Sequence, residues 1–343
     1  MPEGPEVRRF ADLINTALVD KPIVSLTART RRAKAWLSEH SDILTGRRIE
    51  KVRSRGKYLI GWIEGGYYFY SHLMMWGRWM TVEQEPIEID RRERARIVVP
   101  DATAILYSAP VFELGIGDPF ESVETLKTLG ADILPYPDGE PFDRLTFKTR
   151  LLTPENGGTI GATLLDQQIV AGIGNYLRAE ILFDCRLDPW RKVADLTPDD
   201  LERLYNSIVL MAQRAYSLGG VTVSPEDKIR LASDKSLVYR LGSEFGSRHY
   251  VFRRTNLPCL RCGDTIRQLR QVTRSNDEEE KTRIIYFCPT CQNTKVEPKK
   301  PRRKQLSVTS YQLPKNAMPA SKEGVNLPLQ VSDWSSPEDI NSM

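Results

Sequence analysis

Four of the five cysteines form two Cys-x-x-Cys pairs late in the chain, CLRC at 259–262 and CPTC at 288–291. Two such pairs provide the four thiolates of a tetrahedral zinc site, and the residues between them have the pattern of two strands. Two disulfides or a redox Cys-x-x-Cys are the alternatives. The expected intracellular location disfavours the first, and a redox site would not need two copies. We predict a zinc-clamped hairpin with one structural ion, held by Cys259, Cys262, Cys288 and Cys291, and we assign Cys185 to the core.

The spacing of apolar residues changes along the chain and predicts separate domains. Residues 1–19 have helical spacing, whereas short runs rich in Val, Ile and Tyr between 22 and 115 indicate antiparallel β-structure. The Pro- and Gly-rich LPYPDGEP at 134–141 indicates a linker, and helical spacing follows it. We predict a multidomain α+β fold: an N-terminal helix with an antiparallel β-sandwich over 1–135, a helical domain over 142–240, the zinc finger over 248–295 and a disordered basic and polar tail over 296–343.

The charge distribution indicates a polyanionic partner. The chain has 343 residues and a net charge of only +4, yet basic residues gather in clusters at 29–34, 47–57, 91–96 and 247–254. Each cluster alone could be ordinary solvated surface, but together they suggest one basic face. The sequence shows no signal peptide and no apolar run of transmembrane length, so we expect an intracellular protein without membrane contact.

Two short motifs have both a structural and a functional interpretation. The opening MPEGPEV suits a helix start, with Pro5 in the first turn and Glu6 near the positive end of the helix dipole. If Met1 is removed, Pro2 also becomes a free secondary amine beside a carboxylate. GIGN at 172–175 is either an ordinary corner between two helices or a close backbone approach whose N–H groups, with Asn175, bind a DNA phosphate.

Four segments taken together resemble the formamidopyrimidine-DNA glycosylase/endonuclease VIII family of base-excision repair enzymes. They are MPEGPEV, SRGKYL around Lys57, DQQIVAGIGNYLRAEILF, and the cysteine hairpin ending in FCPTCQ. The resemblance covers about residues 1–292 in the family's order. It implies a β-sandwich, a helix–two-turns–helix domain and a zinc finger, with damaged DNA in the cleft between them.

The resemblance also implies roles for individual residues. The amine of Pro2 would attack C1′ of the damaged nucleotide and form an iminium, as a lysine Schiff base does. Glu3 would be the general acid and base, with Glu6 as a second carboxylate at the site. Lys57 would bind phosphate and move protons during strand cleavage. Asn175 and the zinc-finger Arg283 would hold phosphates, and Arg283 would assist the second elimination.

Three contrasts favour the endonuclease VIII branch. Met74, Met75 and Trp76, with His72 just before them, resemble the three-residue wedge that fills the gap left by a flipped nucleotide. LYSAPVFELG at 106–115 lacks the Arg and the wedging Phe of the purine branch, and Gly161 stands where that branch tends to have a lysine.

The resulting prediction is a monomeric, cytoplasmic, nucleoid-associated glycosylase and abasic-site lyase that removes oxidised pyrimidines with β,δ-elimination. The alternatives are a lesion-binding protein of the same fold without excision, an oxidised-purine glycosylase, and a zinc-ribbon protein of transcription or translation.

Overall fold

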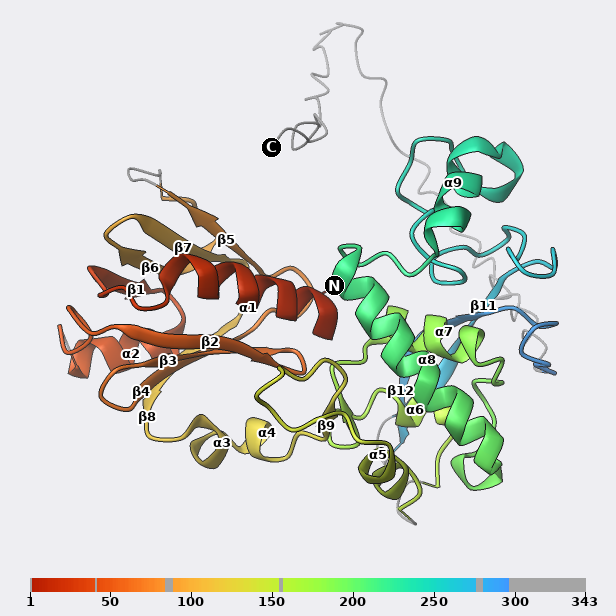
Figure 1. The fold of residues 1–343 in the computed structure, drawn as a ribbon, viewed down its shortest axis with the longest axis horizontal. Helices are drawn as coiled ribbons and strands as arrows, with labels where there is room; N and C mark the ends of the chain where they lie inside the picture. Colours follow the sequence, from red (N-terminus) through yellow and green to blue (C-terminus); the bar gives the residue numbers. More distant parts are fainter. Residues whose placement is uncertain (1, 41, 84–88, 154–156, 276–279, 296–343) are drawn as a thin grey trace, which may run out of the picture. The chain divides into compact units, whose positions relative to one another are not determined.

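The computed structural model describes residues 2–40, 42–83, 89–153, 157–275 and 280–295 (Figure 1). All of them belong to one compact unit. The predicted tail at 296–343 lies outside the described residues. No helix in the described part of the chain has the length and apolar character needed to cross a membrane.

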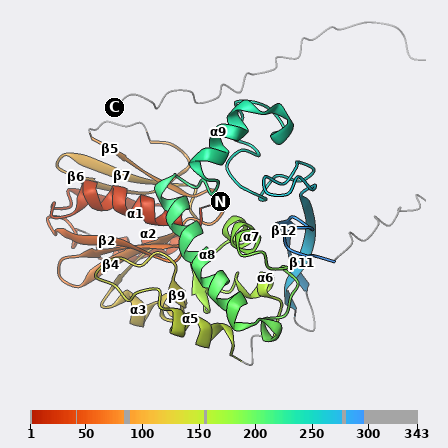
Figure 2. The ribbon, with the colours of Figure 1, turned by 45° about the vertical axis from the view of Figure 1, so that its right-hand side comes forward.

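The N-terminal part has helix α1 (Gly4–Leu18) packed between two four-stranded antiparallel sheets (Figures 1 and 2). The first sheet has the order β2 (Ile49–Arg55), β3 (Tyr58–Ile63), β4 (Tyr67–His72) and β8 (Val111–Ile116). The second has the order β1 (Ser25–Ala28), β6 (Glu93–Val99), β7 (Ala102–Tyr107) and β5 (Arg78–Val82). The apolar face of α1 joins the core between the sheets, which confirms the predicted helix and β-sandwich.

Glycines shape the two turns at opposite ends of β3. Gly65 and Gly66 both have positive φ angles and form the turn between β3 and β4, as a Gly-Gly pair between two apolar runs predicts. Gly56 turns the β2–β3 hairpin, and a Cβ atom there would lie 2.9 Å from the side chain of Ala171. The absence of a side chain at Gly56 therefore lets the hairpin, with Lys57 next to its tip, approach the GIGN segment.

Helix α2 (Arg31–Glu39) was not predicted. Ala33, Trp36 and Leu37 recur at helical spacing, but the helix is short and the prediction assigned the whole of 22–115 to β-structure. The helix contacts β8 of one sheet and β1 of the other, and Ala33 joins the core between them.

The middle of the chain is mainly helical. The elements after β8 are α3 (Pro119–Ser122), α4 (Glu124–Lys127), β9 (Ala131–Asp132), α5 (Arg144–Leu151), α6 (Ile160–Thr163), β10 (Val170–Ala171), α7 (Asn175–Asp184), the 3₁₀ turn η2 (Val193–Asp195), α8 (Pro198–Ser217), α9 (Pro225–Ser233) and the 3₁₀ turn η3 (Lys235–Leu237). The helical spacing of apolar residues over 196–219 predicts one helix there, and this helix is α8, which Thr197 begins with a capping box to Asp200.

The prediction of helical structure on both sides of GIGN was wrong on the N-terminal side. There the chain has only the single turn α6, followed by turns and by the two residues of β10, which pair with β9. The apolar residues of this stretch are buried in the core without forming a regular helix. Their helical spacing in the sequence therefore indicated a helix that the structure does not have.

The cysteine module has the predicted antiparallel hairpin, β11 (Arg267–Ser275) with β12 (Glu280–Phe287). Its strands contact α6 and α7, as the views in Figures 1 and 2 also show.

Candidate active site

The carboxylate of Glu3 lies at the N-terminus of α7. It accepts hydrogen bonds from the backbone N–H groups of Gly174 (2.7 Å), Tyr176 (2.8 Å) and Leu177 (3.2 Å). Because these N–H groups are taken by Glu3, they do not form the phosphate site expected from the GIGN motif. The anion at this helix terminus comes from the protein itself and ties the start of the chain to the helical domain.

Burial raises the pKa of Glu3 to about 7, against the opposing effects of the Lys57 ammonium and the N–H donors, and the nearby Glu6 adds to the rise. The side chain is only 1 % exposed. A carboxyl group with a pKa near neutrality can both donate and accept a proton under physiological conditions, which is what acid–base catalysis needs.

Glu6 and Tyr176 complete the surroundings of Glu3. Glu6 accepts the backbone N–H of Glu3 at 2.8 Å and the hydroxyl of Tyr176 at 2.7 Å. Glu3 and Glu6 also form the capping box of α1, so their structural role at the helix start is real and coexists with their position at the site. Pro2 is half-buried and directly precedes this pair.

Lys57 reaches the same turn from the β2–β3 hairpin. Its Nζ donates to the Ile173 carbonyl at 2.6 Å, and the amide of Gln167 donates to that carbonyl at 2.9 Å. Gly4 N–H donates to the Gly172 carbonyl at 2.9 Å, so the GIGN turn binds both the N-terminus and the lysine. Burial lowers the pKa of Lys57, and the positive charge of Arg283 contributes to that shift.

Gln167 was not singled out from the sequence. Besides its bond to Ile173, its Oε1 accepts the N–H of Gly172 at 3.0 Å, so it holds both sides of the turn. Gln167 lies only six residues before Ile173, in the DQQ segment. No local sequence pattern, however, indicates that its side chain bonds to this turn.

Asn175 and strand β12 of the cysteine module are linked by Arg178, another residue that was not predicted from the sequence. Arg178 is fully buried, and its Nη2 donates to Asn175 Oδ1 at 2.7 Å and to the Ile284 carbonyl at 3.0 Å. The side-chain oxygen of Asn175 thereby has a donor, whereas its side-chain N–H₂ group makes no hydrogen bond to any residue that the structure describes and can bind a ligand. Arg283, next to Ile284, is exposed, and its charge helps lower the pKa values of Lys57 and Arg178. The signal for Arg178 was a charge inside an otherwise apolar helix.

The candidate wedge residues protrude from the turn between β4 and β5. Met74, Met75 and Trp76 are 50 %, 58 % and 79 % exposed, whereas the preceding Leu73 is buried. His72 ends β4 and its Nδ1 accepts the N–H of Met74 at 3.2 Å. Burial, with the charge of Lys57, lowers the pKa of His72 to about 4, which keeps the ring neutral and able to accept this bond.

The four predicted cysteine ligands converge. Their sulfur atoms all lie within 4.8 Å of one another, with Cys259 and Cys291 Sγ 3.8 Å apart and Cys262 and Cys288 Sγ 3.4 Å apart. Four thiols at this separation can hold a metal ion. Cys185 is buried elsewhere, as predicted.

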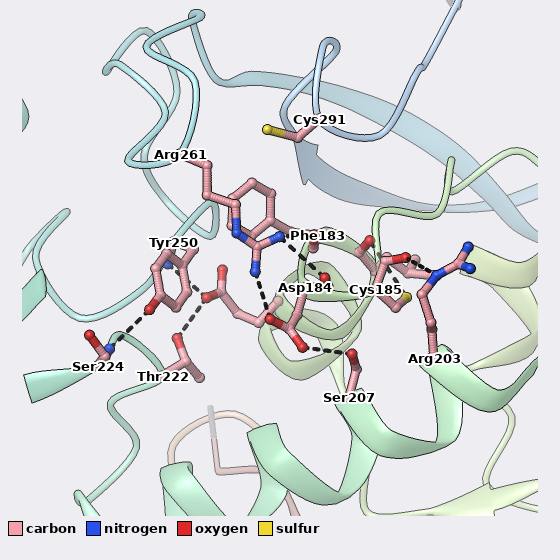
Figure 3. Close-up of polar contacts among 12 residues, drawn as sticks. Phe183, Asp184, Cys185, Arg203, Ser207, Thr222, Ser224, Tyr250, Arg261 and Cys291 are labelled. Atoms are coloured by element: carbon pink, nitrogen blue, oxygen red, sulfur yellow. Dashed lines mark hydrogen bonds and ion pairs between the residues drawn. The ribbon is translucent and has the colours of Figure 1, made fainter. Parts of the chain in front are cut away.

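The cysteine module docks on the C-terminal end of α7 (Figure 3). Arg261, between Cys259 and Cys262, donates to Asp184 Oδ1 at 2.7 Å and to the Phe183 carbonyl at 2.9 Å. A cation at the carbonyl end of a helix is favoured by the helix dipole.

Comparison with known proteins gives consistent results. The family model of the formamidopyrimidine-DNA glycosylase N-terminal domain matches residues 1–110, and that of the formamidopyrimidine-DNA glycosylase H2TH domain matches 133–227. "Endonuclease 8" of Salmonella schwarzengrund is 32 % identical over 297 residues, which are 85 % of this chain and all of that protein. The chain belongs to the formamidopyrimidine-DNA glycosylase/endonuclease VIII family.

Other relatives extend this result. "Endonuclease 8" of Escherichia coli O17:K52:H18 is also 32 % identical, over 85 % of this chain and all of its own length. Lactococcus lactis formamidopyrimidine-DNA glycosylase, solved non-covalently bound to DNA with an abasic site, superposes with a TM-score of 0.66 at 25 % identity, covering 85 % of this chain and all of that one. Members of this family are DNA glycosylases and abasic-site lyases, and this chain is one of them.

Proposed function

We propose that the protein excises oxidised pyrimidines from DNA by covalent catalysis at Pro2, followed by β,δ-elimination. One observation carries this proposal: the GIGN turn is contacted by the backbone just after Pro2, by the Glu3 carboxylate and by the Lys57 amine. Glu3 receives the N–H groups of α7, while Lys57 is bonded to the Ile173 carbonyl of the same turn. A nucleophile, a proton-transfer group with a pKa of about 7 and a second amine are thus grouped at one place.

The proposed chemistry begins with the secondary amine of Pro2, once Met1 has been removed. An α-amino group has a pKa of about 7.7–8.0, so a useful fraction is neutral near physiological pH. Its nitrogen bonds to C1′ as the bond from C1′ to the base breaks. The amine then loses its proton and the sugar ring opens at the C1′–O4′ bond, with O4′ taking up a proton, so that an iminium forms between the nitrogen and C1′. Glu3 transfers protons at the sugar and the base. Loss of a proton from C2′ then expels the 3′ phosphate, and a second elimination, assisted by Lys57 and Arg283, expels the 5′ phosphate.

DNA binding in this proposal uses Asn175 and Arg283 for phosphates and the exposed turn at 74–76 for the wedge. The bond from Arg178 to the side-chain oxygen of Asn175 supports the assignment of Asn175, because it occupies the acceptor end of the amide and leaves the N–H₂ end as the donor for a phosphate. The wedge also supports a preference for pyrimidine lesions: three exposed residues occupy the turn, and 106–115 contains no arginine that could face an orphan cytosine.

The metal in the cysteine cluster is proposed to be zinc, because four thiolates in tetrahedral reach match its preferred coordination. All four positions are filled by the protein, so zinc would fix the fold of the hairpin that carries Arg283. We further propose that the enzyme acts as a monomer on damaged chromosomal DNA inside the cell.

Borohydride trapping on duplex DNA with an abasic site tests the nucleophile. The mature protein is expected to form a covalent complex, and peptide mapping should place the DNA adduct on the Pro2 nitrogen. The same protein with an acetylated N-terminus is the control and should give no complex. Equal trapping by protein that retains Met1 would exclude Pro2.

A panel of duplexes tests the substrate class. Base release and end groups are measured with an oxidised pyrimidine and with an oxidised guanine opposite cytosine. Faster release of the pyrimidine, with phosphate at both ends of the gap, is expected. The opposite order would assign the enzyme to oxidised purines.

A further inference from the structure

Two arginine-rich segments far apart in the sequence meet at one end of the β-sandwich. In the sheet register Ala28 of β1 lies opposite Ala95 of β6, and the N–H of Arg29 donates to the Arg94 carbonyl at 2.8 Å. The Arg29 guanidinium also donates to the carbonyl of Asp90, at 3.3 Å. The clusters at 29–34 and 91–96 therefore adjoin each other where Arg29 meets Arg94.

The same end of the sandwich carries the wedge turn. Arg78, which follows that turn, lies opposite Tyr107, and Tyr107 lies opposite Glu93 at the start of β6. On the other side, the wedge turn packs on the β7–β8 turn, since a Cβ on Gly77 would lie 2.9 Å from that of Ala109. The four strands β5, β7, β6 and β1 span about 14 Å at the usual strand spacing, so the arginines extend from the wedge across less than one duplex diameter.

Carboxylates neutralise only part of this surface. Asp90 pairs with Arg92, Glu93 with Arg96, and Glu113 with Arg32. Four arginines of the two segments form no ion pair with any residue that the structure describes, and we name them the arginine rim: Arg29, Arg31, Arg91 and Arg94.

Three rim residues are directly available to a ligand. Arg29, Arg31 and Arg91 are exposed, and Arg31 lines a surface pocket together with Pro110 of the β7–β8 turn. Arg94 is half-buried and donates to the Arg91 and Glu93 carbonyls, so it holds the backbone from which Arg91 projects.

We propose that the arginine rim binds backbone phosphates of the duplex beyond the point where the wedge enters it. This inference rests on the proposed function, because it takes the turn at 74–76 as the part that enters DNA. DNA held by that turn must pass the adjoining end of the sandwich, and its phosphates are the polyanion that unpaired guanidinium groups attract. The rim thereby extends the DNA-binding surface from the cleft across the end of the sandwich, without reading bases.

The salt dependence of binding tests the rim. The variant R29Q/R31Q/R91Q removes three positive charges, and K21Q/R48Q/K51Q removes three from the opposite end of the same sandwich. Affinity is measured by fluorescence anisotropy on a duplex with a stable abasic-site analogue, over a range of salt concentrations. Because each phosphate contact contributes about 0.9 to the slope of log K against log salt, the rim variant should lose about two to three units of slope and the control less than one. Thermal unfolding verifies that both variants are folded.

Shortening the duplex from either side of the lesion gives a second measurement. Truncation on one side should weaken the unmodified protein at least tenfold and leave the rim variant nearly unaffected, because the phosphates removed are those that the rim contacts. Equal slopes and equal truncation effects for the rim variant and its control would overturn the proposal.

The binding readout separates this inference from the proposed function. Failure of trapping or excision, with the difference in slope intact, would remove the function and leave the rim as a DNA-binding surface. Normal trapping without a difference in slope would remove the rim alone.

Discussion

Two buried glutamates, one at the N-terminus of α7 and one within that helix, each accept three backbone N–H groups, and we interpret them as serving different purposes. Glu3 accepts three backbone N–H groups at the helix N-terminus. Glu180, within the helix, accepts the backbone N–H groups of Tyr250, Val251 and Phe252. Burial raises the pKa of both.

The other groups around Glu3 and Glu180 distinguish the two sites. Glu3 lies within electrostatic reach of Lys57 and Glu6 and directly follows Pro2. The fourth donor to Glu180 is the hydroxyl of Thr222, at 2.6 Å, part of the network in Figure 3, and Thr222 Oγ1 in turn lies 2.9 Å from the neutral ring of His249. Four donors converge on a carboxylate that joins α7 to the segment entering the cysteine module. A raised pKa therefore does not identify a catalytic acid by itself; nearby titratable groups and a nucleophile do.

The largest expected effect is on catalysis at Glu3. Glu3→Gln keeps the size of the side chain and an acceptor for α7 but removes proton transfer, so base release in single turnover should slow about 10²–10⁴-fold. The loss is measured on a duplex containing an oxidised pyrimidine.

Glu180→Gln, the same change at the glutamate within α7, is the matched control. Its rate of base release should stay within threefold of that of the unmodified enzyme at a temperature where the variant is folded. Comparable slowing by both variants would remove the distinction between the two glutamates.

The pH dependence of stability sharpens the comparison. The pKa of Glu3 in the folded protein, about 7, lies above its ordinary value of 4.5, so the folded state holds this proton more tightly than the unfolded state. Between those values the free energy of unfolding should fall as pH rises, by about 3 kcal/mol in total from this group. The Glu3→Gln variant lacks this contribution, and Glu6 and Asp132, whose pKa values are also raised, remain in both proteins.

Urea unfolding at pH 4.5 and pH 7.5 measures this difference. The unmodified protein should lose stability relative to Glu3→Gln as the pH rises. Parallel profiles would show that Glu3 does not titrate in this range.

Glu180→Gln should act on stability instead of chemistry. In the variant, Oε1 can still accept from Val251 and Phe252. The new N–H₂ group takes the place of Oε2, which accepts the N–H of Tyr250 in the unmodified protein, so this N–H would lose its acceptor. A buried donor left unpaired costs about 1–3 kcal/mol. Urea unfolding at pH 7.5 should show that loss, and an unchanged midpoint would mean that this junction contributes little to folding.

The sequence predicted one of these glutamates and not the other for a physical reason. Glu3 belongs to a short contiguous motif, MPEGPEV, and Lys57 and the cysteines likewise lie in local patterns that a chain reveals without its fold. Glu180 lies in NYLRAEILF, where the partners that explain it are 70 to 72 residues away. Arg178 in the same helix was missed for the same reason, because the Ile284 carbonyl to which it donates is 106 residues away in the sequence.

The fold shows the same division. The sheets, α1, α8 and the cysteine hairpin follow from local periodicity, and the structure confirms them. Helix α2 was missed although Ala33, Trp36 and Leu37 have helical spacing, because it is short and lies between runs that indicate strands. The stretch before GIGN is irregular although its spacing is helical, because its apolar residues are buried against distant elements. A charge inside an apolar helix was the one signal for Glu180 and Arg178, and it indicates a buried partner without saying which.

The smallest expected effect concerns Tyr176, whose hydroxyl donates to Glu6 at 2.7 Å while its backbone N–H donates to Glu3. Tyr176→Phe keeps the ring and the N–H and removes one hydrogen bond from a partly buried carboxylate, worth about 1 kcal/mol. If Glu6 is part of the site around Glu3, base release should slow by less than tenfold, while the free energy of unfolding falls by no more than about 1 kcal/mol. Thr222→Val removes the corresponding hydroxyl from Glu180 and should reverse the pattern, with a loss in unfolding free energy and no loss in rate. Both variants are measured by single-turnover base release and urea unfolding at one pH. The same pattern in both would mean that the hydroxyls only support the packing of α7, and that Glu6 belongs with Glu180 as a structural carboxylate.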